Sequence, residues 1–438
     1  MRKFWIDNLI TTVFTFGVMI GIYGVTQLKV FDAFDPIGKA FGDMEITDIA
    51  FSQLRDDPEL DTNIVIVNIG YLSRGEIGQQ IMTLNKYNPK VIALDIIFSC
   101  DGGIKDPVNC PQAFDTLNNM IFAEAMRQAG DRMVMAQKLH QTKGLVEKYG
   151  DIALYDSIEH TDPELLQNAH EGFVNLETDA DHQEDLKVCR SYNPRIEVNG
   201  KQELAFSTKI AMQFDSVRTK RYLARNRDSE TINYRGNIVD WHGASAFSGR
   251  YMVLDFDQAL DTNQFVPSMI KDKIIILGFL GADLTDTSWD DKFITPLNKN
   301  YAGKTRPDMY GVVVHANAVS MILNEDYIGE MADWQEYALA FLICLLNAAL
   351  FSLINRHMPI WFDGVTVLAQ LLQIIVLSFL MIYLFSWINF KLNLTITLAA
   401  VALVGTCFEI HHNVFNRIAA KLRAQKALTK EQEQVLTP

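Results

Sequence analysis

Long apolar runs near the two ends of the chain separate a membrane part from a water-soluble part. One run covers residues 9–28, and three more lie at 337–354, 365–384 and 394–410. A helix needs about 20 apolar residues to cross a hydrocarbon core of roughly 30 Å. The pattern therefore predicts four transmembrane helices, with one large domain over residues 29–336 between the first and the second.

The positions of Lys and Arg predict the orientation of these helices. Residues 1–8 carry Arg2 and Lys3, and the tail 411–438 is rich in basic side chains. Because cytoplasmic loops hold an excess of Lys and Arg, both termini are predicted to be cytoplasmic and the large domain to lie outside. The run 9–28 is longer than a signal-peptide core and no small-x-small cleavage site follows it, which favours an uncleaved anchor over a signal peptide.

Small and amide residues inside the spans predict helix–helix contacts. Gly17, Gly21 and Gly24 punctuate the first span, and such spacing lets another helix, from the same or another chain, approach closely. The alternative is that glycine is simply common in membrane helices. Three amide side chains lie inside the later spans and are predicted to bond across helices: Asn347, Gln370 and Gln373.

Strand-like and helix-like segments alternate in the large domain. Short β-branched runs predict buried strands at 63–69, 91–98, 132–136 and 273–278. Helical patterns lie at 76–87, 112–129, 202–214 and 311–324. This alternation predicts an α/β fold with a largely parallel sheet covered by helices. The polar stretch 140–171 is interpreted as an excursion from that sheet.

Charge and cysteine content restrict the functions of this domain. The chain has a formal net charge of -14, so the external domain is acidic and nucleic acid is not an expected partner. Cys100 and Cys110 flank a loop rich in Gly and Asp, which favours a disulfide between them in an oxidising compartment. In the alternative, Cys189 pairs with one of the two. Their spacing is not that of a zinc site.

Six segments of the domain, taken in order, resemble a known family. They are the strand 64–69, residues 89–98, residues 172–181, residues 232–236, the strand 273–278 with Asp286 and Thr295-Pro296 after it, and residues 309–317. Together they resemble the second type of the CHASE family, the cyclase- and histidine-kinase-associated extracellular sensory domain. The arrangement of one helix before the domain and three after it is also similar to that family.

The resemblance implies a periplasmic sensory domain on the inner (cytoplasmic) membrane of a bacterium. In that family the last helix commonly leads into a kinase, a cyclase or another signalling domain. Here it leads into the basic tail 411–438, which predicts no fused output domain. The expected partners are therefore the lipid bilayer, a second copy or other proteins of an envelope complex, and a small periplasmic ligand.

Three polar residues are candidates for ligand binding. Asp95 and Asp286 follow the carboxyl ends of two predicted strands, where ligands gather in open α/β sheets, and His315 lies near the start of a predicted helix. In the alternative reading, the two carboxylates cap loops and the histidine bonds a backbone carbonyl. The acidic loop around Asp286, which also contains Asp290 and Asp291, lacks the spacing of a calcium loop and is interpreted as solvated.

Two functional hypotheses follow. The first is a sensor that binds a small ligand or a protein and signals through its helices to a separate partner. The second is a structural or accessory subunit of a secretion, motility or transport complex. The chain contains no recognisable pairing of a nucleophile with its base, so no enzymatic activity, metal or cofactor is expected.

Overall fold

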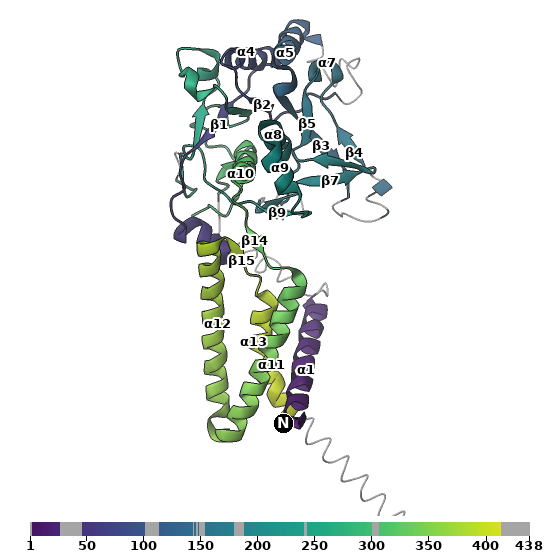
Figure 1. Ribbon diagram of the computed structural model, residues 1–438, viewed down its shortest axis with the longest axis vertical. Coiled ribbons are helices and arrows are strands. Elements are labelled where there is room, and N and C mark those ends of the chain that lie inside the picture. The colour runs from purple at the N-terminus through teal and green to yellow at the C-terminus, as the bar shows by residue number, and fades with distance from the viewer. Residues whose placement is uncertain are drawn as a thin grey trace, which may run out of the picture. The chain divides into compact units, whose positions relative to one another are not determined.

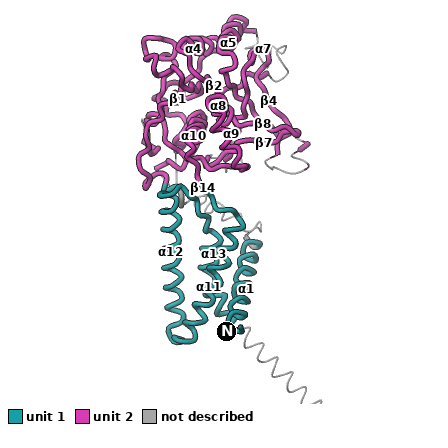
Figure 2. Tube along the Cα trace, in the orientation of Figure 1, with its two compact units in different colours: residues 1–50, 329–438 teal, residues 51–328 magenta. Residues whose placement is uncertain are grey.

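The structure, a computed structural model, consists of two compact units (Figure 2). The helical unit combines residues 1–50 with 329–438, and the α/β unit covers residues 51–328. The described residues are 2–26, 46–100, 114–142, 144–145, 148, 154–178, 188–240, 243–299 and 306–412.

A mainly parallel sheet forms the centre of the α/β unit (Figure 1). The strand order is β10-β1-β11-β2-β3, with β5 parallel to β3 and β4 antiparallel to it. This arrangement confirms the predicted fold class. The strands are β1 (Asp61–Asn68), β2 (Val91–Leu94), β3 (Met133–His140), β4 (Ser157–Glu159), β5 (His170–Phe173), β10 (Tyr251–Leu254) and β11 (Ile274–Gly278).

Helices cover both faces of this sheet (Figure 1). Alternate side chains of a strand point to opposite faces, so Val65 and Val67 of β1 pack with α4 and α5, whereas Ile64 and Ile66 face the opposite layer. That opposite layer contains α8 and α10. The helices are α4 (Arg74–Asn85), α5 (Thr116–Ala129), α7 (Pro163–Leu166), α8 (Phe206–Phe214), α9 (Ser216–Leu223) and α10 (Gly311–Asn324).

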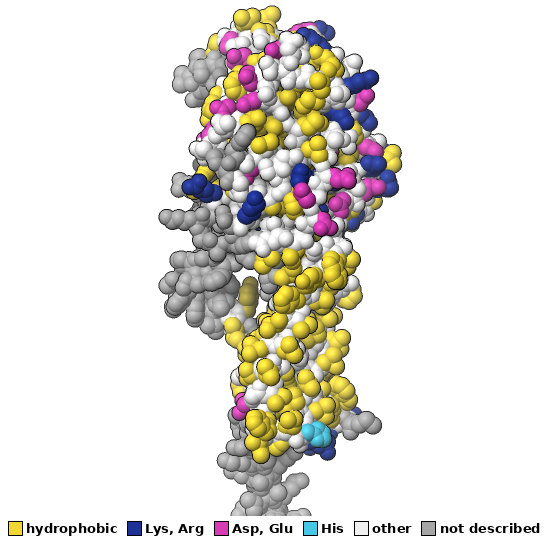
Figure 3. Space-filling view, turned by 90° about the vertical axis from the view of Figure 1, so that its left-hand side faces the viewer, with side chains coloured by type: hydrophobic (Ala, Val, Ile, Leu, Met, Phe, Trp, Pro, Cys, Tyr) yellow, Lys and Arg dark blue, Asp and Glu magenta, His cyan; other side chains and the backbone are white. Residues whose placement is uncertain are grey.

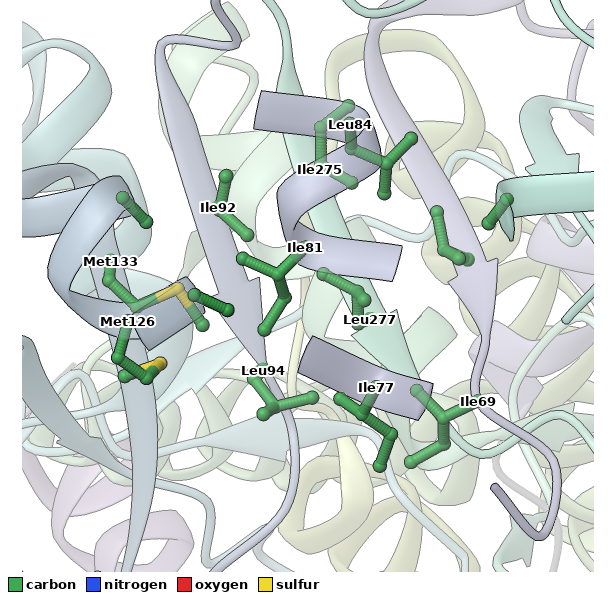
Figure 4. Packing of buried hydrophobic residues seen from close by; sticks show 14 of the residues in the cluster. Ile69, Ile77, Ile81, Leu84, Ile92, Leu94, Met126, Met133, Ile275 and Leu277 are labelled. Atoms are coloured by element: carbon green, nitrogen blue, oxygen red, sulfur yellow. The ribbon is translucent and has the colours of Figure 1, made fainter. Parts of the chain in front are cut away.

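The core between α4 and the sheet is mostly aliphatic (Figure 4). Ile81 and Leu84 of α4 pack with Ile92 of β2 and Leu277 of β11, and all four side chains are fully buried. Ser73 starts α4 with a capping box, which satisfies backbone donors at the helix end. The predicted helix 76–87 is therefore present, shifted by about one half-turn toward the N-terminus.

Close backbone approach on the other face requires glycine. A Cβ atom on Gly278 of β11 would lie 2.6 Å from Cγ2 of Val312 in α10, and one on Gly172 would lie 2.7 Å from the Cα atom of Phe206 in α8. Both separations are shorter than van der Waals contact. Two glycines within the segments that resemble the CHASE family thus let α10 and α8 lie close to the sheet.

One predicted helix begins later than the sequence pattern indicated. Residues 202–214 were expected to be helical, but α8 starts at Phe206. The preceding residues form β8 (Lys201–Leu204), which pairs antiparallel with β7 (Arg195–Val198). Asn199 and Gly200 between them have φ of 51° and 79°, as a two-residue hairpin turn requires. An Asn-Gly pair is the sequence signal that this prediction overlooked.

The sheet is larger than predicted. The stretch 140–171, interpreted as an excursion, supplies β4 and the start of β5, and β10 was not predicted. The strand predicted at 91–98 ends at Leu94. Four shorter strands complete the unit: β6 (Ser191–Tyr192), β9 (Glu230–Thr231), β12 (Lys292–Phe293) and β13 (Met309–Tyr310).

The helical unit contains three described helices long and apolar enough to cross a membrane, within residues 2–24, 333–357 and 359–388. On one face of this unit most side chains are hydrophobic (Figure 3). The fourth helix has 16 residues, so four spans remain a prediction. The elements are α1 (Arg2–Thr26), α3 (Ile46–Ile49), β14 (Gly329–Glu330), α11 (Asp333–His357), α12 (Phe362–Ile388), β15 (Phe390–Lys391) and α13 (Thr395–Ile410).

Amide side chains within the helical unit differ in their partners. Gln370 of α12 donates from Nε2 to the carbonyl of Val401 in α13 at 2.6 Å, which confirms bonding between helices. Asn347 instead donates from Nδ2 to the carbonyl of Ile343 in its own helix. One of the amides therefore links two helices directly, while another bonds its own backbone.

Gly278→Ala is expected to destabilise the α/β unit by about 1–3 kcal/mol, because the added methyl group overpacks the contact with Val312. Gly144→Ala is the matched control, since no atom lies within 4 Å of a Cβ at that position. The measurement is the denaturant midpoint of the full chain in detergent. Equal midpoints for the two variants would contradict the close packing of α10 on β11.

Candidate ligand-binding site

A pocket of about 240 Å³ opens beyond the carboxyl end of β2, next to the first turn of α10. Its polar wall contains Asp95, Asp291 and His315. Its remaining lining is mostly apolar: Ile96, Ile97, Ala136, Val174, Leu176, Phe293 and Gly311. The structure thus brings together two of the three predicted site residues, Asp95 and His315, and adds Asp291.

A backbone hydrogen bond fixes the position of Asp95, and its carboxyl group lines the pocket. It follows β2, and its N–H donates to the carbonyl of Leu277 at 2.8 Å. No side chain or backbone group in the described part of the chain makes a hydrogen bond to its carboxyl group. Burial, reinforced by the negative charge of Asp291, raises the pKa of Asp95 to about 8.

Asp291 reaches the pocket because two short strands pair. Antiparallel pairing of β12 with β13 places Lys292 opposite Tyr310, and the carbonyl of Asp291 accepts from the N–H of Gly311 at 3.0 Å. The Asp291 carboxylate oxygens lie 3.3 and 3.5 Å from where a Cβ on Gly311 would be. The carboxylate therefore lies against the first residue of α10, where the helix dipole favours a negative charge.

His315 forms the inner wall of the pocket and is only 3% exposed. Its Nδ1 is 2.9 Å from Oγ of Ser207, and its ring meets Phe206 edge-to-face with centroids 5.4 Å apart. Burial lowers the pKa of His315 to about 4, so the ring is neutral at physiological pH. Because Nδ1 is engaged by Ser207, the other ring nitrogen, Nε2, is the one available to a ligand.

Asp286 lies outside this pocket. Its carboxylate accepts from the backbone N–H groups of Ala282 at 2.7 Å and Ser288 at 2.8 Å. These hydrogen bonds lower the pKa of Asp286, as expected for a carboxylate that organises a turn. Gly281, with φ of 92°, packs directly against it. The described contacts of Asp286 therefore match the structural reading of this residue, in which it holds a loop.

Other residues of the resembling segments hold the walls of the site. Asn317 of α10 accepts at Oδ1 from the N–H groups of Arg235 and Gly236, at 2.7 and 3.1 Å. Thr295 donates through its backbone N–H and its hydroxyl group to the carboxylate of Asp308, both at 2.8 Å. These hydrogen bonds hold the segments that flank α10 in place, so these polar groups have a structural role.

The described residues include only some of the cysteines for which pairing was predicted. Cys100 is disulfide-bonded, whereas Cys189 is buried and forms no disulfide within the described residues. Cys110 lies outside the described residues, so a bond between Cys100 and Cys110 stays a prediction. Among the residues that the structure describes, no group of three or more His, Cys, Asp and Glu side chains is placed to hold a metal ion.

A protein-family model decides the classification. The model of the CHASE2 domain matches residues 42–354, more than half of the chain. The chain belongs to the CHASE2 family. This confirms the resemblance to the second type of CHASE domain. The chain matches no curated protein and no solved structure.

Membership of the CHASE2 family gives this pocket a context. CHASE2 domains are extracellular sensory domains. With three helices able to span a membrane, the chain is accordingly a membrane protein of sensory type. In this CHASE2 domain, the pocket has a mostly apolar lining and a polar wall of three groups. These are a carboxyl group without a hydrogen bond from the described residues, a second carboxylate and a neutral imidazole. Such a site offers acceptors and one negative charge to a small molecule.

Asp95→Asn is expected to stabilise the α/β unit at pH 8 and to have little effect near pH 4. The folded protein holds the Asp95 proton up to about pH 8, whereas the unfolded chain loses it near pH 4. The wild-type chain therefore loses stability between these values, by up to about 1.4 kcal/mol per pH unit. Denaturant midpoints of both proteins from pH 4 to 8 check this; a difference independent of pH would contradict it.

Proposed function

We propose that this chain is a bacterial inner-membrane sensor whose CHASE2 domain lies in the periplasm and binds a small cationic ligand at Asp95, Asp291 and His315. Ligand binding changes the packing of its helices and thereby signals to a separate protein partner. The single observation that carries this proposal is the Asp95 carboxyl group, which lines the pocket without a hydrogen bond from the described residues.

The size of the pocket supports a small ligand over a protein. At about 240 Å³ it is smaller than the pockets of roughly 300–1,000 Å³ that hold drug-sized molecules. Its mostly apolar floor suits a short aliphatic body. A second group on the ligand then meets the polar wall formed by the two aspartates and the histidine.

The charges of the wall support a ligand that carries a positive charge. Two carboxyl groups share this wall, and His315 is neutral, so it adds no positive charge. A protonated amine can donate hydrogen bonds to both carboxylates. Its charge also favours ionisation of Asp95, so binding of such a ligand releases the proton that Asp95 holds.

Asp95→Asn and His315→Gln are expected to weaken amine binding by about tenfold or more, as loss of a hydrogen bond to a charged group implies. The probes are ethylamine and putrescine, with acetate as a negatively charged probe of similar size. Binding is measured by isothermal titration calorimetry on the full chain in detergent. Asp286→Asn is the matched control, because Asp286 lies outside the pocket. No saturable amine binding, or equal weakening by Asp286→Asn, would overturn the proposed site.

The wild-type affinity for the amine probes is expected to rise with pH up to about pH 8. Below that value the cation must displace the Asp95 proton, which costs up to about tenfold in affinity per pH unit. In Asp95→Asn this dependence is expected to disappear. The check is the same titration at pH 6, 7 and 8; a pH dependence that persists in Asp95→Asn would assign the proton to another group.

A second candidate function, a structural or accessory subunit of an envelope complex, has one observation in its favour. Among the described residues, no atom lies within 4 Å of a Cβ built on Gly17, Gly21 or Gly24 of α1. A surface of small residues on a membrane helix lets a helix of another chain pack closely. Such packing would join this chain to a second copy or to a different subunit.

Gly17→Leu combined with Gly21→Leu is expected to reduce the mass of the native particle in mild detergent, because the larger side chains keep a neighbouring helix away. Ile22→Leu, at an exposed position on the opposite side of the same helix, is the control. Light scattering with mass spectrometry measures mass and composition. A particle of unchanged mass would rule out packing through this surface, and a particle containing other proteins in fixed ratio would favour the subunit function.

A further inference from the structure

A second cavity, of about 200 Å³, lies in the α/β unit, away from the Asp95 pocket. Two arginines, Arg55 and Arg235, share its wall with Asn233 and with two acidic residues, Glu59 and Asp326. Arg55 belongs to the segment that enters the α/β unit after Ala50, and Asp326 belongs to the segment that leaves it before Gly329. The cavity is thus built where the chain enters and leaves this unit.

Arg55 is anchored at one edge of its guanidinium group. Its Nη1 donates to the carbonyl of Tyr234 at 2.8 Å, and its side chain lies over the ring of Phe51 at 5.7 Å. Its Nη2 is 3.8 Å from Oδ2 of Asp326, a distance too long for a hydrogen bond. The Arg55 side chain is 18% exposed, and among the described residues only its Nη1 makes a hydrogen bond, which leaves donors on Nε and Nη2 for a ligand.

Arg235 is held in a similar way and has a donor left over. Its Nε donates to Oγ of Ser320 at 3.0 Å, and its Nη1 donates to the carbonyl of Glu59 at 3.3 Å. Its Nη2 makes no hydrogen bond within the described part of the chain. Burial lowers the pKa of Arg55, and the positive charge of Arg235 lowers it further.

We infer that this cavity binds an oxyanion, such as a phosphate, sulfate or carboxylate group, between Arg55 and Arg235. Planar guanidinium groups with free N–H donors bind these groups through paired hydrogen bonds. An anion between the two arginines also relieves their mutual repulsion. Such a ligand carries the charge opposite to that of the amine proposed for the Asp95 pocket, so the two sites select different ligands.

The position of Asp326 gives this site a route to the helices. Asp326 competes with the anion for Arg55, and its carbonyl accepts from Nδ2 of Asn233, another residue of the cavity wall, at 2.9 Å. An anion that takes Arg55 from Asp326 therefore loosens the segment that runs on into β14 and α11. Anion binding is thereby coupled to the part of the chain that leads into the helical unit.

The test is isothermal titration calorimetry of the full chain in detergent with inorganic phosphate, sulfate and acetate, at constant ionic strength set with chloride. Arg55→Gln is expected to weaken binding at least tenfold, and Asp326→Asn to tighten it at least threefold by removing the competing carboxylate. Arg127→Gln is the control, because this arginine is exposed and pairs with Glu124 outside the cavity.

The site is supported if anion affinity falls in Arg55→Gln and rises in Asp326→Asn. A general loss of folding would instead lower the affinity of both variants. If Arg55→Gln does not fold, wild type and Asp326→Asn decide alone. The inference is overturned if the wild-type chain shows no saturable binding of any of the three anions. It is also overturned if Arg127→Gln weakens binding as much as Arg55→Gln does, or if Asp326→Asn leaves the affinity unchanged.

A repeat in lipid nanodiscs identifies the source of the anion. The discs contain phosphatidylcholine alone or phosphatidylcholine with phosphatidylglycerol. If phosphatidylglycerol weakens phosphate binding to the wild-type chain but has no such effect on Arg55→Gln, a lipid headgroup competes for the cavity. Equal phosphate affinity in both discs would assign the site to a free anion.

Discussion

The burial of α10 against the sheet is the constraint on which the α/β unit depends. Every residue of this helix except Asn324 is buried, although it contains His315, Asn317 and Ser320. A buried polar group without a partner costs about 1–3 kcal/mol, so each of these side chains has to be satisfied inside the protein. Asn317 bonds the Arg235-Gly236 backbone, Ser320 bonds Asp61, and His315 bonds Ser207. α10 thus joins segments that are far apart in the sequence.

The same helix connects the two candidate sites. Its first turn, at Gly311, touches Asp291 in the Asp95 pocket, and its last turn leads directly to Asp326 in the arginine cavity. A rigid, fully packed helix moves as one body, because its neighbours on the sheet allow only discrete arrangements. A ligand bound at one end of α10 changes the affinity of the site at the other end only if it binds one of these arrangements more tightly than the other.

The polar residues divide into those that hold the fold and those left available to ligands. Asp286 and Asp308 accept hydrogen bonds from nearby backbone N–H groups and so stabilise loops. Burial raises the pKa of both Asp308 and Asp95, but Asp95 has no such donors in the described structure. The three carboxylates look alike in the sequence. Their local donors determine which of them is a candidate for binding.

The sequence by itself determined the features that depend on local periodicity. Apolar runs separated the helical unit from the α/β unit, β-branched runs located β1, β2 and β11, and helical spacing located α4 and α10. Two of three ligand candidates, Asp95 and His315, were also predicted, because the ends of parallel strands and the start of a packed helix meet at one edge of a sheet. The family resemblance rested on the same segments.

Only the tertiary structure decided what depends on distant pairing. Asp291 joined the site because β12 pairs with β13, two strands of two residues each that carry no periodicity to detect. β5 and β10 joined the sheet although each has only four residues, since their neighbours in space supply the hydrogen bonds that define them. Arg55 and Arg235, which are far apart in the sequence, line one cavity because the fold brings their segments together. Local sequence fixes which face of an element is apolar, but long-range contacts select which polar side chains converge.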